Sequence, residues 1–165
     1  MAFTREEAYA ALASLNPAPV FLQAYHTERL PENLDISFGV PEEFFIAADS
    51  QEPYTHGQMI PILDDGNFGL VTFLNPHTRE LVQVDVESPG EVRGVFQNWQ
   101  QFLADLLIGI GESGVTDEQL RRIAELVGFA HTDALFAFFE RIQDANNAEY
   151  RALREQFVSS ISEGS

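Results

Sequence analysis

The feature that most constrains the fold is a run of four short, strand-like segments that leads directly into a capped helix. Val82, Val84 and Val86 alternate with polar residues, which places one face of their segment in a core and the other in water. Asp-Gly and Pro-Gly dipeptides separate segments at hairpin spacing. The pattern predicts an antiparallel meander with strands at 58–63, 68–74, 81–86 and 92–96.

Single residues refine this prediction. Pro61 has no N–H to donate to a sheet ladder, so the first strand belongs at an edge or ends its pairing there. Segment 68–74 is apolar on both faces apart from Thr72, so the second strand is predicted to be the more buried one. Asn98 is a typical N-cap, and the apolar residues after it recur at helical spacing. A helix is therefore expected from Asn98 to Leu107.

The N-terminal region is more irregular. Thr4 and Glu7 form a capping box, which predicts a helix over 5–15. Prolines then divide short apolar pieces as far as the first strand. For these pieces we predict a short helix near 18–26 and one or two strands within 35–48.

The C-terminal region is predicted to be all helical. The glycines of Gly109–Gly114 indicate a linker, although they also spell a dinucleotide-binding pattern that here follows a helix instead of the required strand. Thr116 opens a capped helix that stops at Gly128. Further apolar stripes at helical spacing extend from Thr132, and Asn146-Asn147 either breaks or bends the helix that carries them.

Taken together, these segments predict an α+β fold, with an antiparallel meander of about four to six strands packed against helices. We expect a domain boundary that separates an α+β domain at 1–110 from a helical extension at 111–165.

Charge restricts the class of partner. The 165-residue chain has a formal net charge of −17, from 26 acidic residues against nine arginines, and it contains no lysine. Residues 41–112 hold twelve of the acids and two of the arginines, a net charge of −10. Nucleic-acid binding is not expected, because phosphate backbones require basic patches. A strongly negative surface either attracts cationic partners or serves solubility alone.

Other chemistry is sparse. There is no cysteine, no run approaching the roughly 18 apolar residues of a membrane span, and no secretory pattern at the N-terminus. We therefore expect a cytoplasmic protein without membrane association. The four histidines lack metal-ligand spacing, and Asp64-Asp65 is typical of an acidic turn. We expect no cofactor, no metal and no enzymatic activity.

A family resemblance rests on the same block. The strand Ile60-Pro-Ile-Leu63, the turn Asp64-Asp-Gly-Asn-Phe-Gly69, the strand Leu70-Val-Thr-Phe-Leu74 and the helix centre Trp99-Gln-Gln-Phe-Leu103 resemble the SUKH superfamily. That superfamily includes yeast cell-wall synthesis regulators and many bacterial toxin-immunity proteins. The resemblance implies a non-enzymatic domain that works by occluding a partner protein.

An immunity protein of this kind would cover the basic surface of a toxin with its acids. The expected contact residues are acids on turns and on outward strand positions: Asp64, Asp65, Glu80, Asp85, Glu87 and Glu91.

Two alternatives remain open. The chain is a regulatory or scaffold protein whose helical tail docks a partner or self-associates, or it is a small hydrolase or metal enzyme that uses Asp64, Asp65 and His77. The second alternative requires those three side chains to converge.

Overall fold

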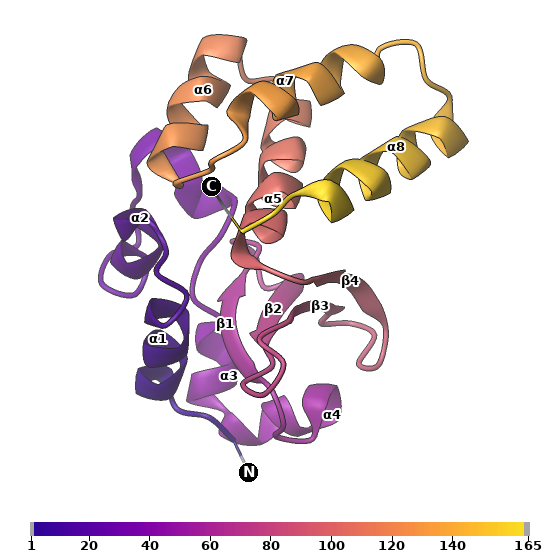
Figure 1. Ribbon diagram of the computed structural model, residues 1–165. Coiled ribbons are helices and arrows are strands. Elements are labelled where there is room, and N and C mark those ends of the chain that lie inside the picture. The colour runs from indigo at the N-terminus through magenta and orange to yellow at the C-terminus, as the bar shows by residue number, and fades with distance from the viewer. Residues whose placement is uncertain (1, 164–165) are drawn as a thin grey trace. The chain divides into compact units, whose positions relative to one another are not determined.

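The four strands form one antiparallel sheet in the order β1-β2-β3-β4 (Figure 1), in a computed structural model that describes residues 2–163. The strands are β1 (Ile60–Asp64), β2 (Leu70–Leu74), β3 (Leu81–Asp85) and β4 (Val92–Phe96). The predicted α+β class and meander are confirmed. β1 lies at an edge, as Pro61 predicted, and β2 is the most buried strand.

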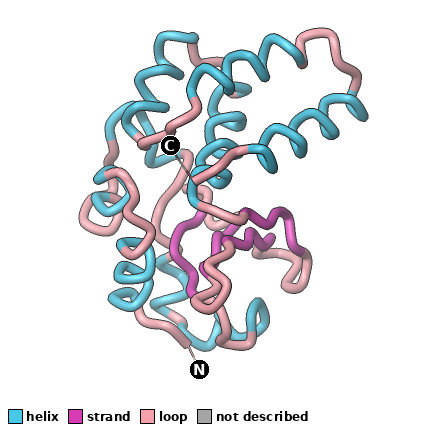
Figure 2. The backbone as a smooth tube through the Cα atoms, viewed as in Figure 1, coloured by secondary structure: helices cyan, strands magenta, loops and turns pink. Residues whose placement is uncertain are grey.

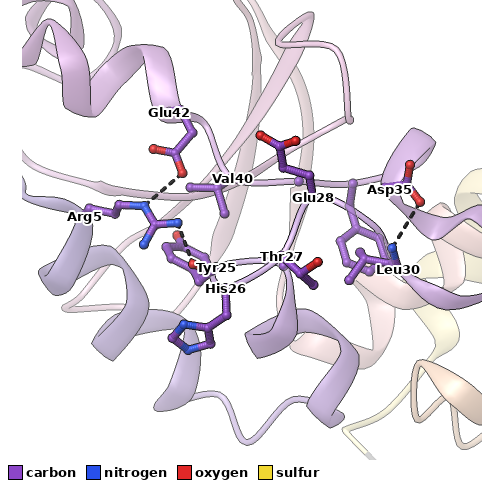
Figure 3. A pocket seen from close by; sticks show the side chains of 12 residues that line it. Arg5, Tyr25, His26, Thr27, Glu28, Leu30, Asp35, Val40 and Glu42 are labelled. Atoms are coloured by element: carbon purple, nitrogen blue, oxygen red, sulfur yellow. Dashed lines mark hydrogen bonds and ion pairs between the residues drawn. The ribbon is translucent and has the colours of Figure 1, made fainter.

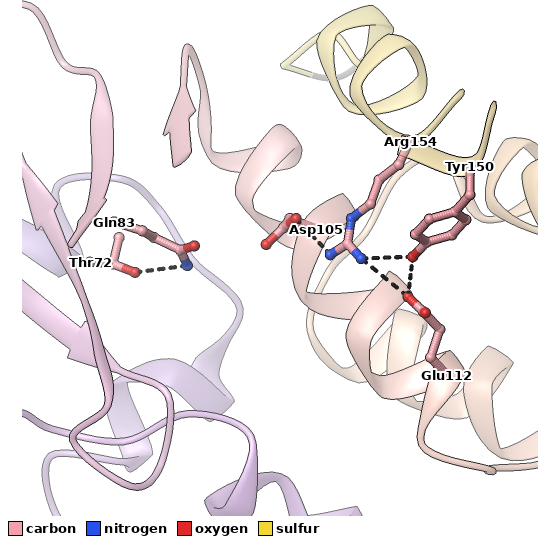
Figure 4. A network of polar contacts seen from close by, with 6 residues as sticks. All are labelled: Thr72, Gln83, Asp105, Glu112, Tyr150 and Arg154. Carbon is pink, nitrogen blue, oxygen red and sulfur yellow. Dashed lines mark hydrogen bonds and ion pairs between the residues drawn. The ribbon is translucent and has the colours of Figure 1, made fainter. Parts of the chain in front are cut away.

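The register gives the sheet one apolar face. Val71 pairs with Val84 and Phe73 with Val82, so these side chains point to the same side. Phe44 packs there with Val71, Phe73 and Val84 in a buried cluster. The alternation of Val82 and Val84 with polar residues therefore marks a true core face. On the opposite face, the Gln83 Nε2 donates to Thr72 Oγ1 at 3.3 Å (Figure 4).

Short helices precede the sheet. Their bounds are α1 (Arg5–Ala13), α2 (Pro19–Gln23), η1 (Pro31–Ile36), α3 (Glu42–Ile46), η2 (Ala48–Gln51) and α4 (Glu52–Thr55), where η denotes a 3-10 helix. The predicted capping box is present, because the Thr4 hydroxyl accepts from the Glu7 N–H at 3.1 Å and Glu7 accepts from the Thr4 N–H at 2.9 Å. Helix α1 packs against β1.

The strands predicted within 35–48 are wrong. This segment contains the end of η1 and helix α3, and its only sheet-like pairing among described residues is one bridge between Gly39 and Asp64. The short apolar piece around Phe38 does not form a strand face, because Phe38 is buried against Phe21, with ring centroids 4.4 Å apart, whereas Ile36 is 73% exposed. The two side chains do not share a sheet face.

Four helices follow the sheet (Figure 2): α5 (Trp99–Glu112), α6 (Asp117–Leu126), α7 (Thr132–Arg141) and α8 (Asn147–Ser160). The all-helical prediction is confirmed. The Asn98 side chain caps α5. The Asn146 side chain caps α8, so α7 and α8 are two separate helices and not one bent helix.

The predicted linker at Gly109–Gly114 is wrong over residues 109–112, because α5 continues to Glu112. Gly111 lies in close packing against Phe139 inside this helix. A Cβ at Gly111 would lie 2.6 Å from Phe139 Cζ, whereas nothing lies within 4 Å of a Cβ at Gly109. The role of Gly111 therefore depends on tertiary packing and cannot be seen in the local sequence.

The contacts between Cα atoms divide the chain into two compact units between Phe96 and Gln97. We call the part that ends at Phe96 the sheet unit and the part that begins at Gln97 the helical unit. The division falls before α5, whereas the predicted one, between residues 110 and 111, falls within it. No helix in the described part of the chain combines the length and apolar character needed to cross a membrane.

Candidate functional site

The meander brings five of the six predicted contact residues to one end of the sheet. The β1–β2 turn and the β3–β4 turn share that end because the strands alternate in direction, and the Val86 N–H donates to Gly69 O at 2.9 Å between the two turns. We call this region the acidic hairpin end and define it by Asp64, Asp65, Asp85, Glu87 and Glu91. Glu80 lies in the β2–β3 loop at the opposite end.

Asp64 ends β1 and is half-buried. Its Oδ1 accepts from the Gly66 N–H at 2.8 Å, which closes the turn. Burial is the largest influence on this carboxyl, and it raises the pKa of Asp64 to about 6. Its backbone also exchanges two hydrogen bonds with Gly39, at 2.8 and 3.3 Å. Asp64 therefore joins the hairpin to the segment before α3.

Asp65 holds the same turn from the next position. Its Oδ1 accepts from the Asn67 N–H at 3.2 Å and from the Gly69 N–H at 2.9 Å. Such side-chain bonds to nearby amides are typical of aspartate in turns. The predicted acidic turn, with Gly66 at a φ of +87°, is confirmed.

Asp85 organises the second turn. One oxygen accepts from the Glu87 N–H at 2.8 Å, and the other accepts from Arg93 Nη2 at 2.8 Å. The Glu87 amide and then Arg93 hold the pKa of the Asp85 carboxyl below its ordinary value. Arg93 Nε also lies 3.6 Å from Glu91 Oε1. Arg93 thus partly neutralises this half of the acidic hairpin end.

The acids consequently have two roles. Asp64, Asp65 and Asp85 hold turns, while Glu87 and Glu91 are exposed to solvent. An exposed carboxylate remains accessible to a basic group from outside. The sequence identified all five as acidic, but only the structure shows that Asp64, Asp65 and Asp85 hold turns and that the exposed Glu91, unlike Glu87, lies near Arg93.

The proposed trio of Asp64, Asp65 and His77 does not converge. His77 lies in the β2–β3 loop, at the end of the sheet opposite to the two aspartates. In that loop, Asn75 Oδ1 accepts from the N–H groups of His77 and Thr78 at 2.9 and 3.2 Å. The loop is a polar turn, and this particular catalytic arrangement is not formed. Among residues 2–163, no three His, Asp or Glu side chains form a group suited to a metal ion.

A cavity of about 460 Å³ opens elsewhere in the sheet unit (Figure 3). It lies beside the chain that follows α2 and the segment that leads into α3. Its polar lining includes Arg5, His26, Glu28, Asp35 and Glu42. Sequence analysis missed this site because its residues come from separate segments without a common motif.

A scan of family models, a search of curated proteins and a search of solved structures each find no match for this chain. The SUKH resemblance therefore remains a prediction from the residues of the block that begins at Gln58.

Proposed function

We propose that the chain is a non-enzymatic immunity protein of the SUKH type, which neutralises a basic toxin domain in the cytoplasm by covering it. The observation that supports this proposal most directly is the gathering of Asp64, Asp65, Asp85, Glu87 and Glu91 at one end of the sheet. A concentrated negative field speeds the encounter with a basic partner.

The turn geometry suits such a role. Asp64, Asp65 and Asp85 hold their turns through backbone amides, so little conformational entropy remains to be lost there on binding. Glu87 and Glu91 project from one of these turns into solvent. A rigid turn that presents exposed carboxylates can form ion pairs with arginines or lysines of a partner.

The first test is protection of cells. The chain is co-expressed with the toxin encoded beside its gene, and growth and copurification are measured. We expect growth to be restored and the complex to weaken as NaCl is raised from about 50 to about 500 mM, because exposed ion pairs are screened by salt. Failure to protect against any neighbouring toxin would contradict the proposal.

A charge-matched pair of variants locates the contact. Glu87→Gln with Glu91→Gln removes two exposed acids from the acidic hairpin end, and Glu140→Gln with Glu155→Gln removes two exposed acids from the helical unit. We expect the first variant to slow toxin association on the order of tenfold at low salt, and the second to slow it much less.

The same pair tests the scaffold alternative. A regulatory or scaffold protein that acts through its helical tail would lose partner binding with the α7 and α8 substitutions and keep it with those in the β3–β4 turn. Equal effects of both variants would show that net charge matters and the acidic hairpin end does not.

A further inference from the structure

The cavity of the sheet unit has an apolar floor and a charged rim. Tyr25, Leu30 and Phe38 line it, and all three are buried. The Tyr25 hydroxyl donates to Ile62 O at 2.6 Å, which fixes the ring against β1. At about 460 Å³, the cavity falls within the range of small-ligand sites, roughly 300–1,000 Å³. It has room for one long side chain and the adjoining backbone.

One part of the rim already holds a guanidinium group. Arg5 Nη2 donates to Tyr25 O at 2.6 Å, and Arg5 Nε donates to Glu42 Oε1 at 2.9 Å (Figure 3). The Arg5 Cζ also lies 5.0 Å from the centroid of the Tyr25 ring. A carbonyl, a carboxylate and an aromatic face are the partners that an arginine side chain prefers.

The rest of the rim is acidic and less fully paired. Asp35 Oδ1 accepts from the Leu30 N–H at 3.2 Å, which positions the carboxylate and leaves its second oxygen available. Glu28 is exposed and has no hydrogen bond or ion pair with the described residues. Figure 3 shows Asp35 on the side away from the Arg5–Glu42 pair and Glu28 between them.

These charges decide the ligand class. Glu28, Asp35 and Glu42 outnumber Arg5, whose charge is compensated by Glu42 at 2.9 Å. Two uncompensated carboxylates would repel an anion, whereas a cation would form ion pairs with them. The rim therefore favours a guanidinium or ammonium group.

The position of the cavity points to the source of that group. Gly39 lines the cavity and forms the backbone bridge to Asp64 of the acidic hairpin end. A protein surface with several basic side chains can therefore reach both regions at once. We propose that this cavity receives an arginine or lysine side chain of the protein partner; this inference rests on the proposed function, whose partner it specifies.

In the test, the full chain is titrated with the peptide acetyl-Gly-Arg-Gly-amide, and the chemical shifts of the backbone amides are recorded by NMR. The control peptide carries citrulline, which has nearly the same shape without the charge. We expect the arginine peptide to shift the amides of Leu30, Asp35 and Gly39, and the citrulline peptide to shift them little. Equal responses to the two peptides, or shifts confined to other regions, would overturn the inference.

Variants examine the rim directly. Glu28→Gln with Asp35→Asn removes two charges, and the amide oxygen that the second substitution introduces can still accept from the Leu30 N–H, so the loop is kept. We expect peptide affinity to fall on the order of fivefold, and the pair in the helical unit, Glu140→Gln with Glu155→Gln, to leave it unchanged. Glu28→Gln alone gives a smaller loss in the same direction if the double variant misfolds. Unchanged affinity in a folded variant would contradict the inference.

The outcomes separate this inference from the proposed function. If the arginine peptide binds but no toxin is neutralised, the cavity stands and the immunity function fails. If the toxin is neutralised and neither peptide nor toxin affects the cavity amides, the function stands and the cavity inference fails. Tighter binding of spermidine than of the peptide would overturn the protein side chain as the source of the cation.

Discussion

The acidic hairpin end of the sheet unit and helix α5 of the helical unit use polar side chains in different ways. In the sheet unit, Asp64, Asp65 and Asp85 accept from amides two to four residues away. In the helical unit, Gln100 bonds to Gly128 and Ala130, 28 and 30 residues away. Gln101 bonds to Ser159 and Ile161, 58 and 60 residues away. Polar groups hold local turns at the acidic hairpin end, whereas those of α5 join distant segments.

The end of the helical unit shows the second use most clearly. The Asn98 side-chain amide donates to Ile161 O at 3.2 Å, and the Trp99 N–H donates to the Glu163 carboxylate at 3.2 Å. Acceptors from the C-terminal segment thus occupy the beginning of α5. A carboxylate is favourable there because the helix N-terminus has free N–H groups and a positive dipole.

Ion pairs extend the same contrast. Arg154 of α8 donates to Asp105 at 2.9 Å and to Glu112 at 3.1 Å, both on α5, and Tyr150 completes the network (Figure 4). In the sheet unit, Arg93 instead pairs with Asp85 and Glu91 of its own hairpin. Long-range pairing joins α8 to α5, whereas the pairing of Arg93 at the acidic hairpin end is local.

The largest expected effect tests whether the two units are separate in stability. Phe73→Ala removes a fully buried ring from the sheet core, at a cost of about 3–5 kcal/mol in the free energy of unfolding. Hydrogen exchange should show protection lost chiefly in β1 to β4. Leu135→Ala, at an equally buried site in α7, is the matched variant and should act chiefly on α5 to α8. If each variant lowers protection equally in both units, the comparison fails.

The next effect concerns Asp64 and pH. Its folded-state pKa of about 6 lies above the ordinary 3.8, so the folded state favours the protonated form. The resulting cost to stability is absent below pH 3.8, grows between these pKa values and is complete above pH 6. Asp64→Asn should therefore raise the free energy of unfolding at pH 7 by up to about 3 kcal/mol, reduced by solvent screening of this half-buried group, and change it little near pH 3.5.

Urea unfolding at both pH values measures this difference, and Asp85→Asn provides a control of opposite sign. The pKa of Asp85 is lowered, so its ionised form contributes stability that is present at neutral pH and lost in acid. Asp85→Asn should destabilise the chain at pH 7. A loss of stability at pH 7 on Asp64→Asn would show that the ionised Asp64 carboxylate does not lower the stability of the folded state.

A smaller effect separates two glycines of α5. Gly111→Ala forces the Phe139 ring to move, because the new Cβ would lie 2.6 Å from it, and should cost about 1–3 kcal/mol. Gly109→Ala has open space and should stabilise the helix by up to about 1 kcal/mol. Thermal unfolding of the pair measures the difference. Equal melting temperatures would show that Phe139 adjusts without cost.

The smallest expected effect concerns the α5–α8 network. Arg154→Met keeps most of the apolar stem and removes the charge that Asp105 and Glu112 share, so we expect a loss of about 1–2 kcal/mol. The loss should shrink in about 1 M NaCl, because the side chains are partly exposed. Arg151→Met, an exposed position on the same helix, is the control. Similar losses for both variants would show that the network adds nothing specific.

Local rules predicted much of the fold. The capping residues Thr4, Asn98 and Thr116 each begin a helix, and the meander follows the alternation of Val82, Val84 and Val86. Prediction failed where a local pattern was not accompanied by the neighbouring element that it usually implies. Ile36 and Phe38 alternate without a neighbouring strand, and Gly111 resembles a linker residue until Phe139 is placed beside it.

The sequence by itself determined the strand order, the starts of the helices capped by Thr4, Asn98 and Thr116, the strong negative charge and the acidic character of the turns, because these depend on neighbouring residues and on composition. Tertiary structure alone decided which acids remain exposed, that His77 lies far from Asp64, and that Arg5, Glu28 and Asp35 surround one cavity. These features depend on contacts between segments distant in the chain, and local sequence periodicity does not encode such contacts.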